Sequence, residues 1–106
     1  VTARMMAKGT IVPARIHPPK VQTMETRGGN EATNQFIVCD GKGNTYFQSY
    51  DSVIARQDAG GNITLDEGRW NFSRTTGQYR NQFLNESISD TRTKIDKGKY
   101  TFANLN

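Results

Sequence analysis

Few side chains in this sequence are of the types that perform covalent chemistry. The one histidine, His17, lies in a proline-containing stretch, and the one cysteine, Cys39, ends an apolar run where it reads as a small core residue. Nucleophilic catalysis needs a nucleophile, a base and a group that orients the base. Asp66 and Glu67 could form a carboxylate pair, but acids between a strand and a glycine are typical of a solvated turn. The sequence therefore argues against an enzyme and predicts no catalytic residue.

Metal and cofactor sites are not predicted either. One Cys and one His cannot supply the roughly four ligands of a zinc site. The segments Asp40–Asn44 and Asp58–Asn62 superficially resemble calcium loops, but both lack alternating oxygen ligands and a closing Glu. Neither segment has the spacing of a phosphate-binding loop. Both are predicted to be hairpin turns, in which Gly and Asn supply a positive φ.

A cluster of arginine and amide side chains around aromatic residues is the one functional signal above this background. The segment 69–84, RWNFSRTTGQYRNQFL, carries three Arg and no acid. Such groups bind phosphate, and helix N-termini add backbone donors. The candidate contacts to nucleic acid or another partner are Arg74, Arg80, Asn81 and Gln82. The alternative is structural, with Arg80 and Asn81 binding backbone carbonyls of the corner at Trp70.

The net charge of +4 is concentrated at the N-terminus. The first 24 residues hold four cations and no acid, whereas the rest of the chain holds ten Lys or Arg and ten Asp or Glu. A basic arm on a neutral domain favours contact with nucleic acid or an acidic partner, and the alternative is a solvated tail. Prolines at 13, 18 and 19 disfavour helix. Residues 1–33 are therefore predicted as an arm that could also link copies of the chain, with candidate contacts Arg4, Lys8, Arg15 and Lys20.

Residues 34–106 are predicted to form one domain. A chain of 106 residues, 34% of them apolar and 9% aromatic, has room for one modest core. Strands are predicted at 35–39, 45–50, 52–56 and 63–65, because these runs are rich in β-branched and aromatic residues. Short Gly-Asn turns between them predict an antiparallel meander of two hairpins. Within the arm, Val21–Met24 could add an edge strand.

Two short helices are predicted after the strands. In the first, at 76–85, Tyr79 and Phe83 fall on one face, and Thr75 resembles a capping residue. In the second, Ser87 and Asp90 form the better capping box, and Gly98 marks its end. Residues 100–105 supply a last strand.

The predicted fold is therefore α+β, with an antiparallel sheet of four to five strands and both helices on one face. The aromatic residues of the corner and the first helix are predicted to form one core cluster. They are Trp70, Phe72, Tyr79 and Phe83.

Three stretches resemble a known family, namely YFQSYDSVIA (46–55), LDEGRWNFSRTTGQYRNQFLNE (65–86) and IDKGKYTFANLN (95–106). They are similar to a family of small domains from bacteriophage and plasmid genomes. Its members share a Y-F-Q-S-Y-x-S-x-I-A strand, a W-x-x-S-x-T-T-x-x-Y-R-N-x-F-L helix and a C-terminal L-N. The resemblance covers about residues 45–106. It implies a mobile-element origin and a compact domain but no chemistry, because the family has no assigned function.

Taken together, these features predict a non-enzymatic accessory protein of a phage or related element that acts by binding. Nucleic acid is the first expected target. A host protein comes second, bound as an inhibitor of a host enzyme or defence complex, and a minor virion or assembly role comes third. No run approaches the roughly 20 apolar residues of a membrane span, so the expected location is the cytoplasm of the host cell.

Overall fold

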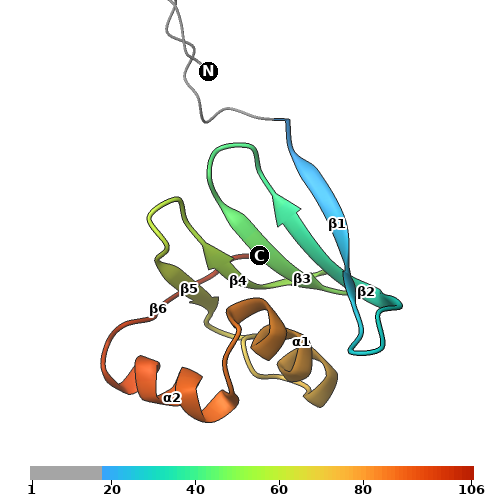
Figure 1. Cartoon of the computed structure of the whole chain (residues 1–106). Coiled ribbons are helices and arrows are strands. Elements are labelled where there is room, and N and C mark those ends of the chain that lie inside the picture. Colours follow the sequence, from blue (N-terminus) through green and yellow to red (C-terminus); the bar gives the residue numbers. More distant parts are fainter. Residues whose placement is uncertain (1–17) are drawn as a thin grey trace, which may run out of the picture.

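The computed structural model describes residues 18–106, so the predicted contacts Arg4, Lys8 and Arg15 lie outside the described residues. Within 18–106 the elements are β1 (Lys20–Glu25), β2 (Glu31–Cys39), β3 (Thr45–Ser49), β4 (Ser52–Gln57), β5 (Ile63–Asp66), α1 (Arg74–Leu84), α2 (Ile88–Asp96) and β6 (Thr101–Ala103). The strands form a single sheet in the order of the sequence. Figure 1 shows α1 against this sheet and α2 next to α1, on the side away from β1. The predicted α+β class is confirmed.

The sheet has one strand more than the four to five predicted, and it is mixed rather than antiparallel. Strands β1 to β5 pair antiparallel with their sequence neighbours. Strand β6 instead pairs parallel with β5, with Leu65 opposite Phe102. The two helices carry the chain back to the end of the sheet where β5 began, and a helical crossover of this kind produces a parallel pair.

The structure also corrects the boundary of the predicted arm. Val21 of β1 pairs with Val38 of β2, and β2 begins at Glu31. The predicted boundary at residue 33 therefore falls inside β2, and residues 20–25 and 31–33 of the predicted arm are strand residues of the sheet. All residues of β1 are exposed except Met24, which is 6% exposed and reaches the core. The possible edge strand at Val21–Met24 is thus present as β1. Such a polar edge strand is stabilised mainly by backbone pairing, so composition indicates it only weakly.

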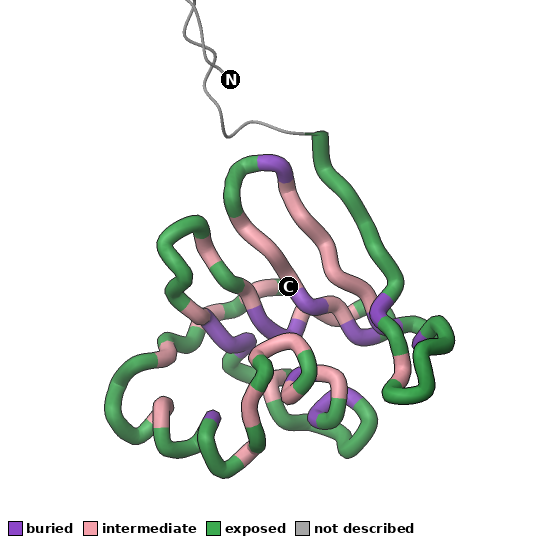
Figure 2. Tube along the Cα trace, in the orientation of Figure 1, coloured by how far each residue is buried: buried purple, intermediate pink, exposed green. Residues whose placement is uncertain are grey.

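The core lies between the middle of the sheet and α1. Buried residues from four strands form it, with Tyr79 and Phe83 of α1 packed against them. The rings of Phe47 and Phe83 stack with centroids 5.9 Å apart. Figure 2 shows that most buried residues gather where the strands pass α1. The core side chains are Met24, Ala32, Phe47 and Ile54, with Ile37 packed against them.

A bulge in β4 increases the apolar surface of this core. The register between β3 and β4 shifts between Phe47 and Gln48, which pair with Ala55 and Val53. Ile54 is the extra residue, and both Ile54 and Ala55 are fully buried. A bulge lets two successive residues face the same side of a sheet, which strict alternation forbids.

The predicted single aromatic cluster is wrong in part. Tyr79 and Phe83 join the core, but Phe72 is 54% exposed. Trp70 is half-buried outside the core. The centroid of its ring lies 6.1 Å from that of Phe102 in β6, and the two rings meet edge to face. The spacing of Trp70 and Phe72 resembles a strand, but the segment forms turns between β5 and α1, so their alternation does not place them on one sheet face.

Both helices begin at serine caps. The oxygen Oγ of Ser73 accepts from the backbone N–H of Thr76, so α1 starts before the predicted Thr75 cap. Thr76 is buried and its hydroxyl meets that of Ser49 on β3 at 2.9 Å. The capping box of Ser87 and Asp90 is confirmed at α2. No helix within 18–106 has the length and apolar character needed to cross a membrane.

Candidate functional site

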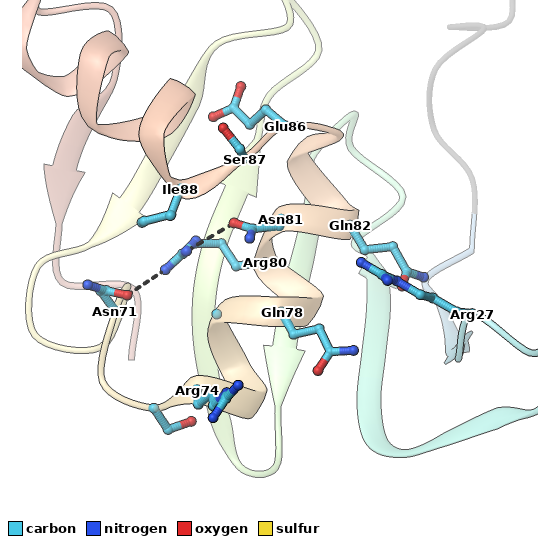
Figure 3. Close-up of a pocket in the computed structure, with 12 residues that line it drawn as sticks. Arg27, Asn71, Arg74, Gln78, Arg80, Asn81, Gln82, Glu86, Ser87 and Ile88 are labelled. Atoms are coloured by element: carbon cyan, nitrogen blue, oxygen red, sulfur yellow. Dashed lines mark hydrogen bonds between the residues drawn. The ribbon is translucent and has the colours of Figure 1, made fainter.

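A cavity of about 720 Å³ lies along the outer side of α1 and reaches the start of α2. We call it the arginine pocket. Figure 3 shows its side chains, which come from the β1–β2 turn, the loop before α1, α1 itself and the start of α2. It contains all four residues predicted from segment 69–84 and adds one cation and two amides that were not predicted as contacts. The cationic and amide residues of its lining are Arg27, Asn71, Arg74, Gln78, Arg80, Asn81 and Gln82.

Arg80 is the most buried side chain of the pocket, with 1% of its surface exposed. Its Nη1 donates to the carbonyl oxygen of Trp70 at 2.8 Å and to Oδ1 of Asn71 at 2.9 Å. Its Nη2 donates to Oδ1 of Asn81 at 3.0 Å. The guanidinium carbon lies 5.3 Å from the centroid of the Trp70 ring, within cation–π range. Arg80 therefore ties α1 to the loop before it, as the structural alternative predicted.

The charge of Arg80 has no anionic partner in the described part of the chain. Its three acceptors are neutral, its Nε has no hydrogen-bond partner, and the ion pair recorded among residues 18–106 joins two other residues. Burial lowers the pKa of the Arg80 guanidinium and the positive charge of Arg92 lowers it further, while the negative charge of Glu86 offsets only part of this. A buried cation without a counter-ion is costly. It also leaves a positive potential at the pocket wall that an incoming anion would lower.

Two exposed arginines add to this potential. Arg27 reaches the pocket from the β1–β2 turn, and Arg74 is the first residue of α1. Of the predicted amides, Asn81 accepts from Arg80, and Nε2 of Gln82 donates to the carbonyl oxygen of Glu25 at 2.9 Å. Gln82 therefore fastens α1 to the edge strand. The groups left facing the pocket can act mainly as hydrogen-bond donors and cations.

Glu86 is the one acid of the lining, and its charge is already neutralised. Its Oε1 accepts from Nζ of Lys94 at 2.7 Å and from the hydroxyl of Tyr100 at 2.8 Å, while its Oε2 accepts from Thr91 at 2.5 Å. Burial alone would raise the pKa of the Glu86 carboxyl, but the bonds from Lys94, Thr91 and Tyr100 outweigh burial and lower it. The net charge of the arginine pocket is therefore positive.

Two other predicted residues lie away from this pocket. Lys20 is exposed at the start of β1 and lines a separate cavity with Cys39. Asp66 is 1% exposed rather than a solvated turn acid. Its Oδ1 accepts from the backbone N–H of Leu105 and from Nδ2 of Asn106, which also bonds the backbone of Val53. Asp66 thus holds the C-terminal segment against β4.

Sequence reasoning missed Arg27 because it reads as part of a flexible Gly-rich link. The only available signal was its positive charge inside a short turn, and no local pattern relates that turn to α1. The pairing of β1 with β2 brings the two together. Residues 18–106 contain no group of three or more His, Cys, Asp or Glu placed to hold a metal ion.

Comparison with protein-family models identifies the family of the chain. A family model described as "Family of unknown function (DUF8033)" matches residues 20–100. No curated protein and no solved structure matches the chain. The matched range begins at the first residue of β1 and contains the whole arginine pocket. The chain therefore belongs to this family of unknown function, DUF8033.

Proposed function

We propose that the protein is a non-enzymatic binding module whose target is nucleic acid, contacted at its phosphates through the arginine pocket. The observation that carries this proposal is the buried Arg80 guanidinium, which lacks an anionic partner within residues 18–106 and lines a cavity with exposed Arg27 and Arg74. Guanidinium groups bind phosphate oxygens through charge-assisted and often bidentate hydrogen bonds.

Electrostatics favours an exchangeable anion at this place. A fixed charge acts more strongly in the low dielectric of a protein than in water, so Arg80 contributes to the pocket even though its own bonds are directed inward. Arg27 and Arg74 are exposed and can move onto a phosphate. Contacts of this kind carry no sequence information. The proposal is therefore for binding without base specificity at this site.

The biological setting is proposed from the resemblance of residues 45–106 to small phage and plasmid domains. In that setting the protein is an accessory product of a mobile element that acts in the host cytoplasm. The binding role is favoured over catalysis because Asp66 and Glu86, two buried carboxylates, spend their oxygens on scaffold hydrogen bonds. The sulfur of Cys39, at the end of β2, lies 4.0 Å from the hydroxyl oxygen of Thr45.

The salt dependence of binding tests the proposal. Each phosphate contact displaces counterions, so log Kd against log salt should be linear with a slope of about 0.9 per contact for duplex DNA. With Arg27, Arg74, Lys20 and the cations of residues 1–17 as candidates, we expect about two to four contacts. Arg74→Ala and Arg27→Ala should each reduce the slope by about one contact and weaken all sequences alike.

Arg69→Ala is the matched control, because Arg69 is exposed just before the pocket's loop and does not line the cavity. Equal losses from Arg69→Ala and Arg74→Ala would mean that net charge matters and that the pocket does not. Absence of binding to duplex and to single strands at tens of micromolar in about 50 mM salt, where electrostatic binding is strong, would exclude nucleic acid as the target.

A second candidate, binding to a host protein, is favoured by the free edge of β1. Among residues 18–106 this strand pairs only with β2, and Val21 is 68% exposed on it. An unpaired edge can receive an extended segment of another protein as an added strand. A pull-down from host lysate with and without nuclease separates the two candidates, since partners that survive nuclease treatment support the protein target.

A further inference from the structure

The sheet face opposite α1 presents one continuous row of side chains. The strand registers place these residues directly opposite one another from β1 to β6. Since Phe47 and Ile37 face α1 in the core, residues one position away along each strand face the other side. We call this row, with its neighbour Phe36, the open-face row. Its members across the sheet are Val21, Val38, Tyr46, Arg56, Thr64 and Thr101.

Aromatic rings occupy the centre of this row. Tyr46 lies opposite Val38, and Phe36 lies opposite Gln48, so the two rings are diagonal neighbours on β2 and β3. Diagonal side chains on adjacent strands are about 7–8 Å apart, close enough for long aromatic groups to form one surface. Both rings are half-buried rather than covered. In Figure 1 neither helix lies on this side of the sheet.

A guanidinium extends the aromatic surface onto β4. Arg56 is directly opposite Tyr46, and its Nη2 donates to Oγ1 of Thr64 at 3.2 Å. Thr64 is held in turn by the hydroxyl of Thr101 at 3.0 Å. The Nε of Arg56 has no hydrogen-bond partner among the described residues. The ring of Tyr46 and the planar cation of Arg56 therefore lie side by side on adjacent strands, and because Nε is buried a ligand would meet the terminal nitrogens of the guanidinium.

We propose that the open-face row binds unpaired nucleobases of single-stranded nucleic acid, with Phe36 and Tyr46 stacking on bases and Arg56 contacting the adjoining phosphate. Stacking on aromatic side chains is the sequence-tolerant way in which proteins hold single strands. A duplex hides its base faces inside its own stack and cannot use such a surface. The inference rests on the proposed function for the class of partner, but it concerns a different surface from the arginine pocket.

Charge favours this occupant over a second copy of the chain. The open-face row contains one cation, Arg56, and no acid, and its neighbours Thr23, Gln48 and Val53 add none. Asp58 follows two residues after Arg56 and the charge of Arg56 helps to lower its pKa, but both of its carboxylate oxygens accept hydrogen bonds from Gly60 and Asn62 within its own turn. A face-to-face dimer would place Arg56 against an identical surface without an anion to pair with it. A nucleic-acid strand supplies both the flat apolar groups for the rings and the phosphate for the guanidinium.

The test measures binding of a fluorescent oligothymidine of about 16 nucleotides and of a duplex to the full chain. The variants are Phe36→Leu and Tyr46→Leu, since leucine retains apolar volume but removes the ring. Each should weaken single-strand binding about tenfold and leave its salt slope and duplex binding unchanged. Tyr50→Leu is the matched control, because Tyr50 is 55% exposed in the β3–β4 turn and lies outside the row.

Thermal melting of each variant checks that the fold is intact, and Arg56→Gln gives a variant that leaves both rings in place. Arg56→Gln should weaken single-strand binding and lower the salt slope by about one contact. If single strands bind but none of these three variants differs from Tyr50→Leu, the inference is overturned and the proposed function stands. If the variants instead abolish a concentration-dependent dimer, the row is an interface between copies. No binding of either nucleic acid overturns both proposals.

Discussion

Arg80 and Glu86 are two buried charges on neighbouring parts of the same pocket, and they are satisfied in opposite ways. Glu86 has a cation, Lys94, and two hydroxyl donors on its two oxygens. Arg80 has three neutral acceptors and an aromatic ring, and its Nε has no partner. The first charge is compensated within the chain. The second is hydrogen-bonded but forms no ion pair within residues 18–106, and the charge of Glu86 acts on it only from a longer distance.

This difference separates a structural cluster from a candidate binding site. A carboxylate with three donors and a paired cation gains little from any further ligand. A buried guanidinium that lacks an anion still gains from one, because the cost of its desolvation is only partly offset by neutral acceptors. Both charges lie next to the same cavity, so burial alone does not distinguish them. The identity of the partners does.

The largest expected effect comes from removing Arg80. Arg80→Ala should lower the free energy of unfolding by about 2–4 kcal/mol, because it leaves the Trp70 carbonyl and the Asn71 and Asn81 amides without their donor and removes a packed stem. Urea denaturation measures this loss. Arg74→Ala is the control, since exposed Arg74 should change stability little. Equal stability of both variants would show that Arg80 does not hold the loop to α1.

A smaller loss in the free energy of unfolding is expected when the compensated charge of Glu86 is removed. Glu86→Gln keeps the shape but removes the charge that pairs with Lys94 and turns one acceptor into a donor, facing either Lys94 and Tyr100 or Thr91, so stability should fall by about 1–2 kcal/mol. Lys94 is 43% exposed and can recover hydration, which limits the loss. The control is Glu67→Gln at an exposed position. A Glu86→Gln loss larger than that of Arg80→Ala would reverse the comparison.

Much of the fold was predictable from local patterns. The hairpin turns illustrate this, because Asp40 and Asp58 each accept from backbone N–H groups two and four residues later. Asp side chains bond the backbone of their own turn in this way, and both turns read Asp, two Gly within three residues, then Asn. Strand β1 was considered only as a possible edge strand at Val21–Met24, and the parallel pairing of β6 was not predicted. Both depend on which strand edge a segment meets in space, and neither a polar strand nor a three-residue strand carries a strong periodic signal.

The site was predictable in composition but not in its electrostatics. Segment 69–84 indicated Arg74, Arg80, Asn81 and Gln82 because cations and amides recur there without an acid. The sequence of this segment could not show that Arg80 points inward and Arg74 outward, because an arginine on a short helix can take either direction. That choice depends on the turns at 67–73, which place the Trp70 carbonyl over the helix. The position of Arg27 beside the pocket depends on the pairing of β1 with β2 at the edge of the sheet.

The smallest expected effect is the acid dependence of stability, which again separates the two charges. Hydrogen bonds from Lys94, Thr91 and Tyr100, opposed by burial, hold the Glu86 pKa below its ordinary value of 4.5. Below pH 4.5 the unfolded chain therefore binds a proton that the folded chain resists. The stabilisation by Glu86 is fully present above that pH and is lost as the pH falls through the lower folded pKa. Arg80 keeps its charge throughout this range, so its contribution should not change.

Denaturation curves at a series of pH values from neutral to about pH 3 measure this dependence. Wild type and Arg80→Ala should lose stability with acid in parallel, whereas Glu86→Gln should show a shallower decline. Some decline should persist in Glu86→Gln because the pKa of Asp66 is also lowered, by bonds from the backbone of Leu105 and the side chain of Asn106 that outweigh its burial. If Glu86→Gln and wild type declined in parallel, Lys94, Thr91 and Tyr100 would not hold Glu86 ionised in the folded chain. Glu86 would then be no better compensated than Arg80. Only the hydrogen-bond geometry would then distinguish the Glu86 cluster from the arginine pocket.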